Sequence, residues 1–141
     1  MMDLSGFLME NAEQMNAEQE IVVSKRFKDA EGRPIPWIAK AIRGDEDEAI
    51  RKSCKMRVQV RKNQYQNETD TDKYLAMFAV ACTVYPNLNS KELQDSYHVM
   101  GAADLIRKML TAGEFANYIE QLEKICGFET LQEEVDQAKN S

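Results

Sequence analysis

The segment TDKYLAMFAVACTVY, residues 71–85, most strongly constrains the fold of this chain. Apolar side chains recur in it at spacings of three and four, which is the period of an α-helix. The apolar stripe comprises Tyr74, Leu75, Phe78, Ala79, Ala81, Cys82 and Tyr85. A helix with so wide an apolar face has to be covered by other elements on several sides. The sequence therefore predicts a central buried helix, which Pro86 ends.

The part of the chain before this helix predicts β-structure. Residues 21–42, IVVSKRFKDAEGRPIPWIAKAI, alternate on both sides of a turn at Gly32 and predict an antiparallel hairpin. Residues 55–62, KMRVQVRK, alternate as well, and we expect them to form a third strand that pairs with this hairpin. Between the two, GDEDEAIRKSCKM predicts a helix in which Asp45 is the N-cap and Glu48 completes a capping box.

The part after residue 85 predicts further helices. Their patterns cover residues 90–97, 101–110, 114–126 and 130–140. Asn89 or Ser90 caps the first, and Gly127 ends the third. The whole chain is thus expected to be α+β, with a small antiparallel sheet (the hairpin plus one strand) packed on a mainly helical C-terminal half. We expect a flexible N-terminal segment at 1–19, one α+β domain at 20–128 and a marginal C-terminal helix at 129–141.

Composition narrows the classes of function. The net charge of −6 opposes binding to nucleic acid or anionic membranes, although a compact basic patch would override that total. No apolar run is long enough to span a membrane, and the N-terminus does not resemble a signal peptide, so we expect a cytosolic protein. The three cysteines, Cys54, Cys82 and Cys126, form no CxxC pair, which argues against a disulfide framework, a zinc site or another cofactor.

Catalytic chemistry is not indicated either. The single histidine, His98, has no residues around it that would converge on one reacting atom, and the sequence contains no nucleophile elbow or phosphate loop. We therefore expect a non-enzyme with no metal at His98.

Two classes of binding protein remain. Residues 90–110 have the rhythm of a helix-turn-helix, which suggests a small DNA-binding regulator, although Asp104 stands near the start of the helix that would read bases. The alternative is a protein-interaction module. The eight methionines suit adaptable apolar contacts, or else fill the core.

Three stretches carry a resemblance to a known family. They are IVVSKRFKDAEGRPIPWIAKAI, DTDKYLAMFAVACTVYPNLNSKELQDSY and GAADLIRKMLTAGEFANYIEQLEKICGF, which together cover most of residues 20–128. They resemble the XkdN-like phage tail assembly chaperones of contractile-tailed phages and prophages of Gram-positive bacteria.

The resemblance implies a function. Such chaperones bind the tape measure protein, keep it soluble in the host bacterial cytoplasm during tail morphogenesis, and are absent from the mature particle. Further partners compatible with the family are the tail tube protein, a frameshifted longer form of the chaperone itself, or a second copy in a homo-oligomer. No catalytic residue is implied.

The partner-binding residues are expected at the weakly anchored ends of the chain. Leu4, Phe7 and Leu8 lie on a short segment with no evident internal partner, and Leu131 and Val135 lie on the marginal last helix. Apolar residues on elements that cannot stabilise themselves are candidates for burial against another chain.

Overall fold

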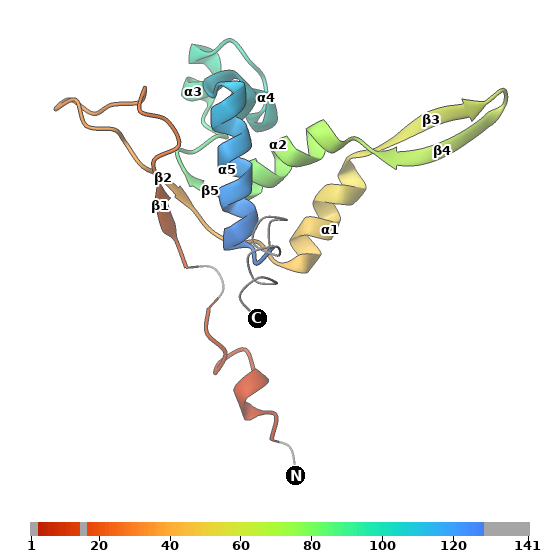
Figure 1. Cartoon of the computed structure of the whole chain (residues 1–141), viewed down its shortest axis with the longest axis horizontal. Helices are drawn as coiled ribbons and strands as arrows, with labels where there is room; N and C mark the ends of the chain where they lie inside the picture. The colour runs from red at the N-terminus through yellow and green to blue at the C-terminus, as the bar shows by residue number, and fades with distance from the viewer. Residues whose placement is uncertain (1–2, 15–16, 129–141) are drawn as a thin grey trace, which may run out of the picture.

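The structure is a computed structural model that describes residues 3–14 and 17–128. The elements, in chain order, are η1 (Ser5–Phe7), β1 (Gln19–Ile21), β2 (Trp37–Ala39), α1 (Gly44–Ser53), β3 (Lys55–Arg61), β4 (Gln64–Thr69), α2 (Thr71–Cys82), β5 (Thr83–Tyr85), α3 (Lys91–Ser96), α4 (Ala102–Met109) and α5 (Ala112–Ile125). Figure 1 shows the small sheet on one side of the helices and a long hairpin on the other. The predicted α+β class is confirmed.

The three-stranded sheet has the order β1-β2-β5 and is antiparallel throughout. The predicted hairpin is present, but its strands are shorter than expected, because Gln19–Ile21 pairs with Trp37–Ala39 and a single isolated bridge joins Lys28 to Pro34 nearer the turn. The third strand is not the predicted segment at 55–62. It is β5, which the sequence pattern assigned to the central helix. The β-branched and aromatic side chains of Thr83, Val84 and Tyr85 favour a strand, and the residue before a proline disfavours the helical region.

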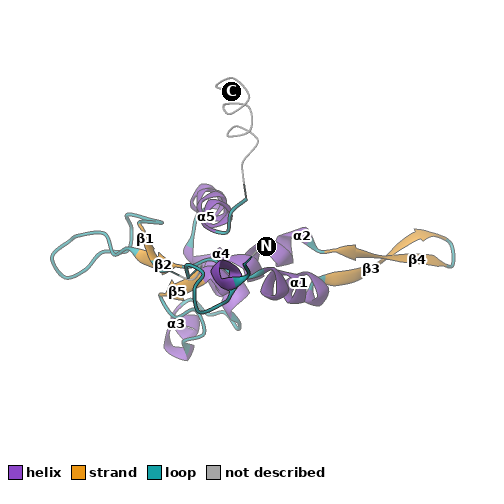
Figure 2. Ribbon diagram, turned by 90° about the horizontal axis from the view of Figure 1, so that it is seen from below, coloured by secondary structure: helices purple, strands orange, loops and turns teal. Residues whose placement is uncertain are grey.

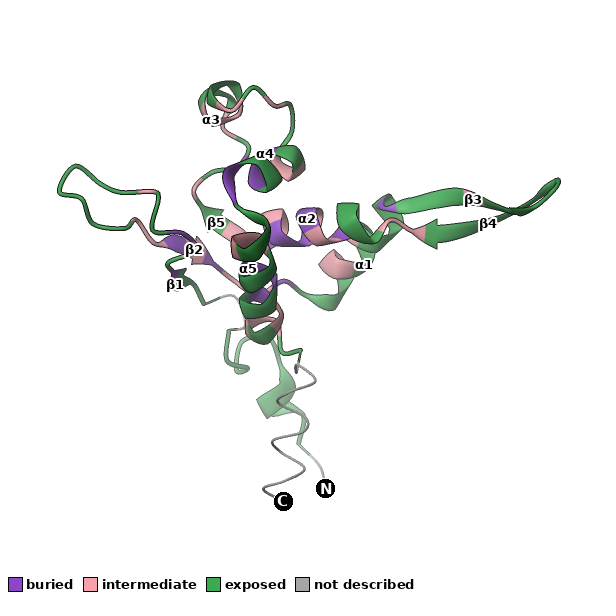
Figure 3. Ribbon diagram, turned by 45° about the horizontal axis from the view of Figure 1, so that its top comes forward, coloured by how far each residue is buried: buried purple, intermediate pink, exposed green. Residues whose placement is uncertain are grey.

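Helix α2 is the central element, as predicted. It contacts α1, α4, α5 and β5. The buried side chains on it are Tyr74, Ala76, Phe78, Ala79 and Cys82. Figure 3 shows that the buried residues gather where α2, α4, α5 and β2 meet, whereas the outlying segments are exposed. Trp37 of β2 joins this core and meets Tyr118 of α5 edge to face, with 5.4 Å between the ring centroids.

Helix α1 has no fully buried residue; Ile50 packs against the core, and polar contacts also tie the helix to α2. The hydroxyl of Tyr74 donates a hydrogen bond to Asp47, and Arg51 contacts Asp47 at 2.9 Å and lies over the Tyr74 ring. The start of α1 differs from the expectation. The N-cap is Arg43 instead of Asp45, and its backbone N–H donates to the side chain of Glu46.

The predicted strand at 55–62 exists as β3, but it pairs with β4 and not with the hairpin. Strand β4 has the polar sequence QYQNET, which gives no hydrophobic alternation, so the sequence pattern does not identify it. Between the strands, Asn63 takes a positive φ of 63°, which suits a tight turn. The β3–β4 hairpin, which we call the arm, points away from the helices (Figure 2).

Helices α3, α4 and α5 lie close to the predicted boundaries, and the predicted last helix at 130–140 lies outside the described residues. Ser90 caps α3 by accepting a hydrogen bond from the backbone N–H of Leu93. Gly127 follows α5 with φ of 92°, and the N–H of Phe128 donates to the carbonyl of Glu123, so the helix ends in a Schellman motif. His98 occupies the equivalent position after α3, with φ of 57°.

Candidate partner-binding surfaces

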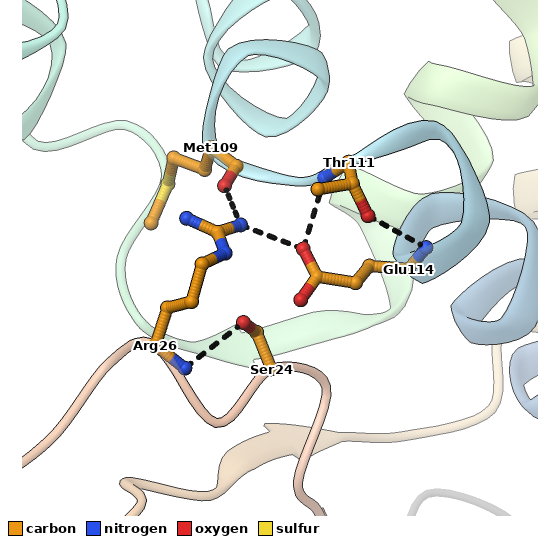
Figure 4. Close-up of polar contacts among 5 residues, drawn as sticks. All are labelled: Ser24, Arg26, Met109, Thr111 and Glu114. Carbon is orange, nitrogen blue, oxygen red and sulfur yellow. Dashed lines mark hydrogen bonds and ion pairs between the residues drawn. The ribbon is translucent and has the colours of Figure 1, made fainter.

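The sheet side and the helical side of the molecule are joined by a polar clamp around Arg26 (Figure 4). The Arg26 guanidinium donates a hydrogen bond of 2.7 Å to the carbonyl of Met109, at the end of α4. It donates a second, of 2.6 Å, to the carboxylate of Glu114 on α5. Glu114 also accepts from the backbone N–H of Thr111, and Thr111 in turn caps α5. The side chain of Ser24 accepts a hydrogen bond from the N–H of Arg26 and is buried.

The clamp has an electrostatic consequence for Glu114. The hydrogen bond from Arg26, supported by those from Ser24 and Thr111, lowers the pKa of the Glu114 carboxyl from 4.5 to about 2. The carboxylate therefore stays charged over the physiological range. Because the Met109 carbonyl has no helical partner at the end of α4, Arg26 satisfies it as well. The clamp holds the α4–α5 junction in place and so shapes the surfaces beside it.

An open groove of about 890 Å³ runs between α2 and α4. Its apolar lining consists of Ile50, Met77, Val80, Ala81, Met100, Ala102 and Ala103. Charged side chains also line it, namely Asp70, Asp72, Lys73, Asp104 and Arg107. The Met100 side chain is 91 % exposed at this groove. An apolar channel between two helices, with charges beside it, has the form that accepts an amphipathic helix.

The N-terminal segment is a second apolar surface. Leu4, Phe7, Leu8 and Met9 are all exposed, and Phe7 and Met9 are 82 % and 98 % exposed. Helix η1 contains no buried residue. Phe7 and Met9 line a pocket of about 480 Å³ together with Arg43 at the start of α1. The segment thus carries apolar side chains that the described part of the chain does not cover. The other two predicted contact residues, Leu131 and Val135, lie outside the described residues.

Exposure of the methionines indicates contact surfaces rather than a methionine-filled core. Among the five described methionines only Met109 is buried, whereas Met9, Met56 and Met100 are exposed and Met77 lines the groove. The methionine content of the sequence is compatible with either role and does not single out the groove residues. The local sequence signal for the groove is the pair of small residues Ala102 and Ala103 next to Met100, because small side chains leave room between two helices.

The second helix of the helix-turn-helix pattern packs into the core of the molecule, and its first turn does not present side chains suited to reading DNA bases. Leu105, Ile106 and Met109 of α4 are buried, and α4 packs on α2. The first turn of α4 carries two alanines and Asp104, and Arg107 forms an ion pair with Asp104 at 3.1 Å. None of these first-turn residues resembles the donors that read base edges.

The thiols are buried or half-buried. The sulfur atoms of Cys82 and Cys126 lie 3.8 Å apart, and burial together with the neighbouring Cys126 raises the pKa of Cys82 above its usual range. Cys54 is also buried. Across residues 3–14 and 17–128, no group of three or more His, Cys, Asp and Glu side chains is arranged to hold a metal ion. His98 is exposed on the loop after α3.

In the part of the chain that the structure describes, none of the helices is both long and apolar enough to cross a membrane.

Comparisons with known proteins identify relatives over nearly the whole chain. The model of the phage XkdN-like tail assembly chaperone family matches residues 4–139. The protein YqbN of Bacillus subtilis (strain 168) is 33% identical over 138 residues, which cover 96% of this chain and 91% of YqbN. The phage-like element PBSX protein XkdN of the same organism is 30% identical over 141 residues, covering 98% of this chain and 94% of XkdN.

A solved structure shows the same fold. The crystal structure of the protein YqbN superimposes with a TM-score of 0.76 at 32% identity, over 92% of this chain and 99% of the YqbN chain. The family match and the two relatives agree with the resemblance carried by the sequence stretches around SKRF, YPNLNSKELQDSY and GEFANYIE. This chain belongs to the family of XkdN-like phage tail assembly chaperones.

Proposed function

We propose that this protein binds the tape measure protein of its phage or prophage tail and keeps that protein soluble while the tail is assembled. It acts in the host bacterial cytoplasm and leaves before the particle is complete. The observation that carries the proposal is the groove between α2 and α4, with its exposed Met100 and half-buried Met77. A long helical chain exposes apolar stripes until tube subunits enclose it, and a groove of this kind covers one such stripe.

Flexible methionine side chains support this function because they adapt to different apolar sequences along one partner. The exposed N-terminal residues Leu4, Phe7 and Leu8 supply a second contact in the proposal, and Leu131 and Val135 supply a third. The net charge of −6 on this chain helps keep its complex with the tape measure protein from aggregating.

Co-expression with the cognate tape measure protein tests the proposal. We expect the tape measure chain to be soluble with this protein, to aggregate without it, and to co-purify with it. If the tape measure chain is equally soluble alone and never co-purifies, the proposal is wrong.

Surface substitutions then locate the contact. Met100→Glu places a charge in the groove, Phe7→Glu in the N-terminal segment, and Val135→Glu in the last predicted helix. Val22→Glu is the matched control, because Val22 is exposed and lies outside all three sets of residues. A variant that co-purifies about tenfold less tape measure protein at an unchanged melting temperature identifies a contact. If only Val22→Glu weakens binding, all three assigned contacts are wrong.

A further inference from the structure

Among the described residues, the arm forms a two-stranded sheet of its own. Strands β3 and β4 pair only with each other, so each strand has one open edge. By the two-residue period Met56, Val58 and Val60 share one face, and Val60 is 55 % exposed. A lone two-stranded hairpin is marginally stable in water, and open edges invite pairing with another chain. These features mark the arm as an interaction surface.

The charge of the arm differs in sign from that of the rest of the molecule. Residues 55–69 carry four basic side chains, Lys55, Arg57, Arg61 and Lys62, and one acidic side chain, Glu68. The arm therefore has a net charge of +3, and because the whole chain has −6, the remainder carries −9. This is the compact basic patch that the total charge conceals. Two arms would repel each other, whereas an acidic surface would attract either one.

Nucleic acid matches this arm less well than a protein surface does. Arg57 lies 3.9 Å from the centroid of the Tyr65 ring and is thereby engaged within the arm. Four basic side chains offer fewer phosphate contacts than the six to ten or so that typical duplex binding uses. Phosphates also leave the apolar face of Met56, Val58 and Val60 uncovered. The occupant of the arm is thus expected to be both acidic and apolar.

The N-terminal segment of this same chain has that chemistry. Residues 1–19 contain four acidic side chains and no lysine or arginine. The acidic residues are Asp3, Glu10, Glu13 and Glu18. They flank the exposed apolar side chains of Leu4, Phe7, Leu8 and Met9, with Asp3 before these four and the others after them. The arm and this segment are therefore complementary in charge, and each exposes apolar surface that the other would cover.

Within one copy the two surfaces lie at opposite ends of α1. Phe7 and Met9 line a pocket with Arg43 and Glu46, at the first residues of the helix. The arm begins at Lys55, directly after the helix ends at Ser53. A helix of ten residues separates them by about 15 Å. Figure 1 shows the N-terminal segment and the arm extending in different directions from the body.

We propose that the arm of one copy binds the acidic N-terminal segment of a second copy. The exchange is reciprocal, because each copy has one arm and one N-terminal segment, and a two-fold pair satisfies both. The pair covers the apolar face of the arm and neutralises its charge. In the pair the N-terminal segment is covered, so the tape measure contact proposed for Leu4, Phe7 and Leu8 requires the pair to open. This inference goes beyond the proposed function and is tested on the purified chain alone, so the failure of one proposal is distinguishable from the failure of the other.

Charge reversal in the full-length chain tests the pairing. Arg61→Glu with Lys62→Glu makes the arm acidic, and Glu10→Lys with Glu13→Lys makes the N-terminal segment basic. Sedimentation at increasing concentration is expected to show a wild-type dimer and about tenfold weaker association for each reversed variant. Mixing the two reversed variants in equal amounts is expected to restore the dimer, and so is placing all four substitutions in one chain.

The matched control reverses charge elsewhere by the same amount. Glu92→Lys with Glu120→Lys changes two exposed residues on α3 and α5 and is expected to leave association unchanged. A wild type that stays monomeric at every concentration overturns the proposal. The proposal is also wrong if charge reversal in the arm abolishes association whereas charge reversal in the N-terminal segment has no effect, because the arm then binds another surface. Retention of single-stranded nucleic acid by the basic arm without self-association overturns it too.

Discussion

The side chain of Phe78 is 1 % exposed and lies 5.9 Å from the ring of Tyr74, measured between ring centroids. Truncation of the Phe78 side chain removes apolar contacts and leaves a cavity in the core beside α2. Phe78→Ala is therefore expected to lower the free energy of unfolding by about 3–5 kcal/mol. Urea denaturation measures the change. Phe7→Ala, which truncates an exposed ring, serves as the control and should change stability by less than about 0.5 kcal/mol. Equal effects of the two substitutions would contradict the central position of α2.

His98 is held in a left-handed conformation that favours glycine. It follows α3 with φ of 57°, its N–H donates to the carbonyl of Asp95, and the N–H of Val99 donates to that of Gln94. His98→Gly is expected to stabilise the protein by about 1 kcal/mol, because the Cβ penalty disappears. Ser96→Gly, at a helical position of α3, is expected to destabilise by about 0.5–1 kcal/mol instead. Chemical denaturation of both variants gives the comparison, and a loss of stability in His98→Gly would refute the argument.

At the scale of elements, the clamp between Arg26 and Glu114 makes the packing of the sheet side on α4 and α5 depend on pH. The pKa of Glu114 is lowered from 4.5 to about 2 in the folded protein. A carboxyl with a depressed folded pKa stabilises the fold above its unfolded pKa, and this contribution is lost as pH falls from about 4.5 towards 2. Glu114→Gln is therefore expected to melt earlier than the wild type at neutral pH, with the difference shrinking in that window.

Melting curves followed by circular dichroism at several pH values check this expectation. Glu120→Gln changes an exposed carboxylate on the same helix and should keep the wild-type melting temperature at neutral pH. A difference between Glu114→Gln and the wild type that persists unchanged down to pH 2 would show that the clamp does not depend on the charge of Glu114.

At the scale of the whole molecule, a compact core carries outlying segments that contribute little to it. The arm and the N-terminal segment are exposed, and the core gathers around α2 (Figure 3). Because of this division, we expect the core to determine the stability of the fold and the exposed segments to determine binding. Substitutions in the groove, arm or N-terminal segment should change association at a constant melting temperature, whereas substitutions of Trp37, Phe78 or Tyr118 should change both.

Local sequence was sufficient wherever one helix or one turn decides the conformation. The stripe on residues 71–85 predicted the central helix, which in the structure ends at Cys82, and Ser90 and Gly127 predicted helix boundaries that the structure confirms. Each depends on interactions within about four residues, namely side-chain periodicity, an N-cap and a positive φ. The family resemblance was also readable from local stretches, and its functional detail remains a proposal.

Tertiary structure decided the strand partners and the surfaces. Residues 83–85 favour an extended conformation locally, but nothing near them indicates that they complete the sheet, because the open edge that they pair with is on β2, more than forty residues earlier in the chain. The polar sequence of β4 conceals the partner of β3. The link from Arg26 to Met109 and Glu114 spans more than eighty residues, and the groove exists only once α4 packs on α2. Pairing and packing between distant segments depend on the whole fold, which local propensity does not encode.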